Sequence, residues 1–267
     1  MRGLSLERPP RWGLISLVLL VAANVALFVL LGGRNDREVA GADTGTRAAA
    51  STAAVASAPP PATTESPSTP SASGTPPVLA VYGDGYAAGN EQGGVGPAGW
   101  PALVADQSGA SLSLHAVAQA GYASLGVTGE DYLDLVAANP VPDAAVTLLF
   151  GSRNDRGEDL GTVRTNAAQA ISAVRATAPG SAVVVIGPAW DDGDVPGDLV
   201  EVRNAVQAAA QEAGATFVDP LAAGWFADQS GLISGDGISP NDDGHVYLSQ
   251  QVLPIVESAL AEVAAQP

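Results

Sequence analysis

The chain has 267 residues, a formal net charge of −17, no cysteine and no lysine, since all eleven basic side chains are arginine. These values allow one sizeable domain with appendages, and they exclude disulfides, thiolate metal sites, a P-loop and lysine chemistry. Residues 78–267 alone carry 23 acidic and five basic side chains, a net charge of −18. Such a surface repels phosphate backbones, so we expect no nucleic-acid partner.

The N-terminal part has the features of a membrane anchor. Residues 1–13 carry three arginines, and residues 14–31 are apolar at all but two positions. At about 1.5 Å per residue, this run approaches the roughly 30 Å of a bilayer core. The positive-inside rule then predicts a single-pass signal anchor in the cell membrane, with residues 1–13 in the cytoplasm and the C-terminal domain extracytoplasmic. The alternative is a signal peptide cleaved at Ala40-Gly41-Ala42, although the apolar run exceeds the usual h-region of roughly 7–15 residues.

Residues 32–77 have the composition of a linker. From residue 41 onward this stretch is almost entirely Ala, Ser, Thr, Gly and Pro, with seven prolines between Pro59 and Pro77. It has no hydrophobic periodicity, so no core could offset the entropy cost of ordering it. We therefore predict a disordered linker over 32–77 that carries a folded domain over 78–267, called the head below.

The head alternates between two kinds of pattern. Apolar, β-rich runs lie at 78–82, 112–116, 145–150, 182–187 and 215–218. Amphipathic stretches lie near 99–108, 129–138, 159–178, 198–213 and 242–264. Strands that alternate with helices predict an α/β fold, here a flavodoxin-like doubly wound parallel sheet of about five strands with helices on both faces. Ligands of such sheets bind beyond the carboxyl ends of the strands.

Four segments of the head fall at those ends. They are Val78–Tyr86 with its Gly-Asp-Gly, the region around Gly121, Phe150–Asp155 with its Gly-x-x-Asn-Asp, and Asp236–His245 with its final Gly-His. In order and spacing they resemble the sequence blocks of the SGNH/GDSL hydrolase family, over essentially all of residues 78–264. The resemblance implies the SGNH-hydrolase fold and ester chemistry by a serine, a histidine and an aspartate.

The resemblance assigns a role to each matching position. It implies that Asp236 orients the base and that Asp84 and Asp155 support the site. The implied oxyanion donors are the Gly85 amide, the Gly121 amide and the Asn154 side chain. Gly85 itself stands where the family has its nucleophilic serine, and Ser239 stands where the family has its histidine base.

These two departures indicate a catalytically impaired homologue. Gly85 has no side chain to form an acyl-enzyme, and Ser239 does not accept a proton at neutral pH as imidazole does. We expect the head to retain a pocket for an acylated glycan or another ester or carboxylate ligand, without cofactor or metal, and as a monomer. Two alternatives stay open: an active hydrolase or acyltransferase with a rewired catalytic site, and a purely structural or partner-binding head. In a rewired hydrolase, a water beside Gly85 could be activated by Asp84, Asp236 or His245.

Other candidate residues have simpler interpretations. His115 is expected to be structural, and Ser152 has no evident base near it. Gly83–Ala88 matches a loose dinucleotide fingerprint, but that motif requires a helix to open at once and an acidic residue to end the second strand. The Asp191–Asp194 cluster lacks the length and glutamate of an EF-hand loop, so we expect a solvated acidic turn.

Overall fold

The computed structural model describes residues 74–266. The predicted cytoplasmic segment 1–13, the predicted anchor 14–31 and almost all of the predicted linker 32–77 lie outside the described residues, so these expectations stay predictions. No helix within residues 74–266 is both long and apolar enough to cross a membrane.

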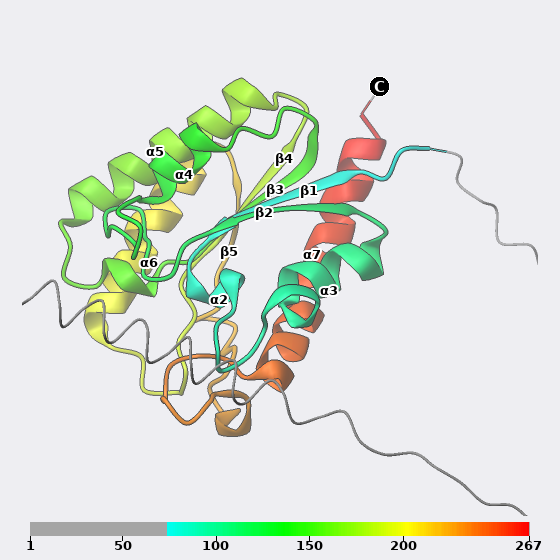
Figure 1. Cartoon of the computed structure of the whole chain (residues 1–267). Helices are drawn as coiled ribbons and strands as arrows, with labels where there is room; N and C mark the ends of the chain where they lie inside the picture. Colours follow the sequence, from blue (N-terminus) through cyan, green and yellow to red (C-terminus); the bar gives the residue numbers. More distant parts are fainter. Residues whose placement is uncertain (1–73, 267) are drawn as a thin grey trace, which may run out of the picture. The chain divides into compact units, whose positions relative to one another are not determined.

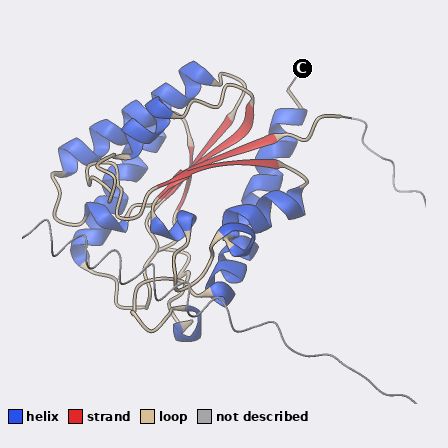
Figure 2. Ribbon diagram, viewed as in Figure 1, coloured by secondary structure: helices blue, strands red, loops and turns tan. Residues whose placement is uncertain are grey.

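A five-stranded parallel sheet forms the centre of the head (Figure 2). Its strands are β1 (Val78–Gly83), β2 (Ser111–Ala116), β3 (Ala144–Phe150), β4 (Ala182–Ile186) and β5 (Thr216–Val218). The order β2-β1-β3-β4-β5 leaves β1, β3 and β4 buried on both sides, whereas β2 and β5 are partly exposed edges. Continuous apolar runs form the central strands because both of their faces are covered. The predicted doubly wound sheet is confirmed.

Helices cover both faces of this sheet (Figure 1). One face carries α4 (Tyr132–Ala138), α5 (Leu160–Thr177) and α6 (Gly197–Glu212), and the other carries α3 (Trp100–Ser108) and α7 (Asp242–Ala264). Each face has its own core of buried apolar side chains. The strands all point the same way, so their carboxyl ends meet at one edge, where the long loops of the head gather.

Local sequence signals fix where the longer helices begin and end. Asp159 caps α5 by accepting from Thr162 N at 2.8 Å, and Asn241 caps α7 by accepting from Gly244 N at 2.9 Å. Such side chains satisfy amides that have no partner within the helix. At the other end of α3, Gly109 adopts φ 67°, the left-handed conformation that commonly terminates a helix.

Four short helical elements differ from the sequence prediction. They are α2 (Gly85–Ala88), η1 (Gly96–Ala98), η2 (Arg153–Asp155) and η3 (Ser230–Leu232). A helix does open directly after β1, as a dinucleotide motif requires, but α2 is only one turn long. A single turn cannot display helical periodicity, so the sequence gives no pattern for it. The acidic residue that a dinucleotide site requires at the end of the second strand is missing, since β2 ends at Ala116.

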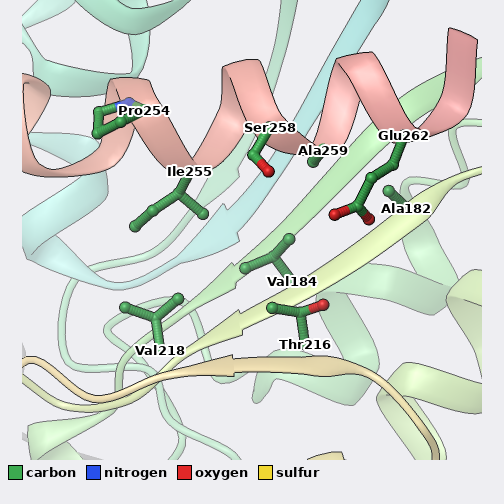
Figure 3. Close-up of a pocket in the computed structure, with 9 residues that line it drawn as sticks. All are labelled: Ala182, Val184, Thr216, Val218, Pro254, Ile255, Ser258, Ala259 and Glu262. Atoms are coloured by element: carbon green, nitrogen blue, oxygen red, sulfur yellow. The ribbon is translucent and has the colours of Figure 1, made fainter.

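A groove of about 330 Å³ lies on the face that α7 covers, beside the edge strand β5 (Figure 3). Val184, Val218 and Ile255 make its floor and wall, and Glu262 lies at one end. The groove includes the first residues of β4 and β5, Ala182 and Thr216. It therefore lies along the side of the sheet rather than at the carboxyl ends of the strands.

Two tyrosines that pack edge to face test how strongly the core depends on hydrogen bonds of buried hydroxyl groups. Tyr122 and Tyr132 are both fully buried, with ring centroids 4.9 Å apart. The Tyr132 hydroxyl donates to Phe150 O at 2.7 Å, whereas the buried Tyr122 hydroxyl has no partner among the described residues. We predict that Tyr132→Phe lowers the free energy of unfolding by about 1–2 kcal/mol, and that Tyr122→Phe leaves it unchanged or raises it. Urea unfolding of both variants checks this, and equal losses would contradict it.

Candidate functional site

The turn that follows β1 places Gly85 at the start of α2. Asp84 caps this helix: its Oδ1 accepts from Tyr86 N at 2.9 Å, and its carbonyl accepts from the Ala87 and Ala88 amides. The Gly85 N–H makes none of these bonds. A Cβ built on Gly85 would meet only Ala118 atoms, at 3.9 Å, which is ordinary contact. The nucleophile position therefore has room for a side chain and lacks only the side chain itself.

Asp84 also joins this turn to the loop that follows β3. Its Oδ2 accepts from Asn154 Nδ2 at 2.9 Å, and the same Nδ2 donates to Ala120 O at 2.9 Å. Both amide hydrogens of Asn154 are thus used within the protein. Asp84 is almost fully buried, and this burial raises the pKa of its carboxyl to about 6.

A second carboxylate, Asp155, holds the loop that follows β2. It is fully buried and accepts from Tyr122 N at 2.8 Å, Ala123 N at 2.8 Å and Ser124 N at 2.9 Å. Its fourth donor is Ser152 Oγ, at 2.7 Å. Ser152 is therefore a partner of this carboxylate and not a free nucleophile.

Gly121 lies against this carboxylate. A Cβ at this position would lie 2.4 Å from Asp155 Oδ1 and 2.6 Å from Ser152 Oγ, so only glycine fits. The Gly121 N–H donates to Ser124 O at 2.9 Å. Two of the three donors that the family resemblance implies, the Gly121 amide and the Asn154 side chain, are therefore engaged inside the protein. Their roles toward an oxyanion stay predictions.

The loop before α7 brings Asp236 and Ser239 beside α2. Asp236 Oδ1 accepts from Ser234 Oγ at 2.6 Å and from the Ser239 amide at 2.8 Å. These hydrogen bonds, of which that from Ser234 has the largest effect, hold the pKa of Asp236 well below its usual value. Ser239 Oγ accepts from Asn90 Nδ2 at 2.9 Å. The base position thus faces the segment that follows α2, with its hydroxyl bonded to an amide.

His245 lies beneath the loop that follows α2 and is 1% exposed. Its Nδ1 accepts from Trp100 N at 3.3 Å, and a Cβ on Gly94 would lie 2.1 Å from its Nε2. Both ring nitrogens therefore face protein atoms. Burial lowers the pKa of His245 to about 4, so the ring is neutral at pH 7. His115 stacks on Tyr82 with centroids 5.2 Å apart, in a structural position on the edge strand β2.

The structure adds three residues that sequence reasoning did not single out. Tyr86 donates its hydroxyl to Ile238 O at 2.7 Å and accepts from Arg153 Nη1 at 3.0 Å. The Arg153 guanidinium lies 4.3 Å from the ring centre of Trp190 and 3.2 Å from Asp191 Oδ1. Arg153 belongs to the Gly-x-x-Asn-Asp segment, and this position in the motif is the sequence signal that could have identified it. Trp190 directly precedes the Asp191–Asp194 cluster. Within residues 74–266, no cluster of histidine and carboxylate side chains is arranged to hold a metal ion.

Known proteins resemble this chain in both sequence and fold. Residues 81–247 match the model of the GDSL-like lipase/acylhydrolase family. A GDSL lipase of Mycobacterium tuberculosis is 38% identical over 190 residues, which cover 68% of this chain and 82% of that protein.

Two solved carbohydrate esterases share the fold. A family two carbohydrate esterase from Clostridium thermocellum, in complex with cellohexaose, aligns with a TM-score of 0.58 at 14% identity, over 70% of this chain and 66% of its own. A family 2 esterase of Corynascus thermopiles with a carbohydrate binding domain aligns with a TM-score of 0.58 at 18% identity, over 72% and 69% of the two chains. At such identities these structures show a common fold and nothing finer.

Gly94 and Gly96 form a matched pair that tests the packing of His245. Both have left-handed backbones, with φ 75° and 61°, but a Cβ at Gly96 would meet no atom within 4 Å. We predict that Gly96→Ala costs only the left-handed backbone strain, about 1–2 kcal/mol. Gly94→Ala should cost at least about 2 kcal/mol more, because its methyl group would overlap the imidazole. Urea unfolding measures both, and similar costs would contradict the close packing.

The raised pKa of Asp84 makes its contribution to stability depend on pH. Folding favours the protonated carboxyl, so this contribution is complete below about pH 4 and is lost as the pH rises through 6. The stability difference between the wild type and Asp84→Asn should therefore shrink from pH 4 to pH 7, by up to about 3 kcal/mol. Urea unfolding at four pH values measures this difference. A difference that does not change with pH would show that Asp84 titrates normally.

Proposed function

The chain belongs to the GDSL-like lipase/acylhydrolase family, and we propose that it is a catalytically impaired member whose head binds a ligand without efficient turnover. The observation that carries this proposal is the pair of positions where the family resemblance implies nucleophile and base. Gly85 offers no nucleophile, and the Ser239 hydroxyl is bonded to Asn90. No serine–histidine pair can therefore form at these positions.

The surroundings support the same proposal, since His245 does not replace the missing base. Both of its ring nitrogens face protein atoms, and its low pKa leaves it a weak proton acceptor at pH 7. The engaged hydrogens of Asn154 and Gly121 also reduce the stabilisation that an oxyanion would receive.

A binding role is supported by what the rim still offers. A side chain at position 85 would meet only Ala118, and the next residue, Tyr86, begins a chain of polar and aromatic contacts through Arg153 to Trp190. The relatives named above are a lipase and two carbohydrate esterases. We therefore propose an acylated glycan or another ester or carboxylate as the ligand class.

We further propose that the head is held outside the cytoplasm by the N-terminal segment. This rests on the apolar run 14–31 and on the arginines before it, which the positive-inside rule interprets as a signal anchor. The linker 32–77 then separates the head from the membrane surface. This arrangement suits a ligand of the cell envelope.

An active hydrolase is the second candidate, and one observation favours it. Asp84 directly precedes the open position at Gly85, and its pKa of about 6 is suited to a general base near neutral pH. Asp236, with its strongly lowered pKa, is too weak a base. If the wild type hydrolyses esters through water, Asp84→Asn should abolish that rate, and the pH profile should show an apparent pKa near 6.

Restoring the two missing groups tests the proposal directly. We predict that full-length wild type shows almost no hydrolysis of p-nitrophenyl acetate. The double variant Gly85→Ser/Ser239→His should be at least roughly 100-fold faster, because it regains nucleophile and base beside Asp236. The release of p-nitrophenol, corrected for hydrolysis in buffer alone, measures both rates.

The matched control is Gly85→Ala/Ser239→His, which introduces the same Cβ and imidazole without the hydroxyl. It should stay at the wild-type rate, which separates triad chemistry from unspecific hydrolysis by an added histidine. A wild-type rate equal to that of the serine variant would contradict the proposed impairment.

A further inference from the structure

We propose that a small pocket beside the degenerate site is a carbohydrate subsite for neutral, β-linked oligosaccharides of glucose or N-acetylglucosamine. This rests on the proposed function, in which the head binds a ligand at this rim. The pocket has a volume of about 60 Å³ and lies between the loops that follow β4 and β5, at the carboxyl edge of the sheet. Two tryptophans, Trp190 and Trp225, line it together with Asp192.

The pocket connects to the Gly85 position through two side chains. Tyr86, the neighbour of Gly85, accepts a bond from Arg153, and Arg153 stacks on Trp190. Arg156 also faces this indole, with its guanidinium 5.1 Å from the ring centre. A chain of direct contacts, through Tyr86 and Arg153, therefore links the Gly85 position to Trp190.

The polar groups of the pocket are arranged as acceptors. Asp192 Oδ1 accepts from Trp190 Nε1 at 3.0 Å and from Asp194 N at 2.8 Å. These two bonds fix the carboxylate beside the indole and leave Oδ2 to accept from a ligand hydroxyl. Because Asp191 lies next to Arg153, the positive charge closest to the pocket is already compensated.

This combination of groups selects the chemistry of the ligand. Sugar rings carry hydroxyls that donate to carboxylates and C–H faces that pack on aromatic rings. In β-1,4-linked glucose and N-acetylglucosamine all ring substituents are equatorial, so each ring presents a flat C–H face. The cavity is too small for a whole ring, but it has room for several waters or for one hydroxymethyl or acetamido arm.

Charge excludes the anionic glycans. Asp192 and Asp194 lie on one short loop of a head whose net charge is −18. Uronic acids and phosphorylated sugars would meet these carboxylates at close range, and such like-charge contacts are costly. A neutral oligosaccharide avoids this cost and keeps the hydrogen bonds.

The wall of the pocket is held in an unusual backbone conformation. Phe226 has φ 73°, which non-glycine residues rarely adopt. In this backbone conformation the Phe226 side chain lies in the core, against Tyr86 and Tyr247. The preceding residue, Trp225, lines the pocket. Strain of this kind concentrates at binding sites.

Isothermal titration of the full-length protein with cellohexaose and chitohexaose tests the proposal. We expect binding of at least one of them and weaker or absent binding of an oligogalacturonate of the same length. Trp190→Ala should weaken binding about tenfold or more, and Trp190→Phe, which keeps an aromatic ring, should weaken it less. Asp192→Asn should weaken it roughly fivefold, because a charged acceptor is lost.

The matched control is Asp194→Asn, on the same loop but outside the pocket lining, which should bind like the wild type. Circular dichroism melts of each variant separate lost contacts from lost folding. Absence of binding to both neutral oligosaccharides, binding that Trp190→Ala and Asp192→Asn do not change, or tighter binding of the oligogalacturonate would each overturn the subsite.

The ester assay separates this proposal from the one on which it rests. A wild type that hydrolyses esters and binds cellohexaose through Trp190 would refute the impairment and leave the subsite standing. A wild type that is silent on esters and binds neither oligosaccharide would refute the subsite and leave the impairment standing.

Discussion

The carboxylate of Asp155 organises the rim on which every functional interpretation of this head depends. It is fully buried, and a buried carboxylate is costly unless hydrogen bonds replace its water. Its bonds come from three consecutive amides of the loop after β2 and from Ser152. One side chain from the loop after β3 thus sets the backbone path of the neighbouring loop, which contacts Gly85 through Ala118.

This network accounts for how the motifs of a hydrolase could persist in the catalytically impaired head that we propose. Gly121 is required because any Cβ would overlap Asp155, and Asn154 is required because it joins Asp84 to the Ala120 carbonyl. These residues hold the loops together whether or not an ester is present. Gly85 and Ser239 contribute less to holding the loops together, since position 85 has open space beside it and the Ser239 hydroxyl makes one hydrogen bond. A glycine and a serine at these two positions are therefore compatible with an intact scaffold.

The long elements could be read from the sequence because their patterns reflect burial. The apolar runs of β3 and β4 mark strands covered on both faces, and the observed bounds differ from the predicted ones by one residue. The one-turn helix α2 has no such pattern, because its existence depends on the cap that Asp84 provides. The predicted anchor and linker lie outside the described residues.

The sequence predicted where the candidate residues lie in the fold, but not how they are bonded. The sequence places Asn154 and Gly121 at the correct edge of the sheet, yet it cannot show that their N–H groups already have acceptors. It likewise cannot show how deeply His245 is buried, because that depends on Gly94, 151 positions earlier in the chain. Long-range contacts of this kind decide which donors remain for a ligand.

The two positions at which the family resemblance implies a nucleophile and a base are not equivalent in the folded head. A serine at position 85 needs only the space that already exists, whereas a histidine at position 239 must displace the Asn90 bond. Position 239 is therefore the harder of the two to convert to the residue that the family resemblance implies. With the Asn154 hydrogens engaged as well, the binding energy for a ligand must come mainly from the aromatic and charged side chains beyond Tyr86. This arrangement supports the proposed role in holding a ligand more than a role in stabilising the charge of an ester transition state.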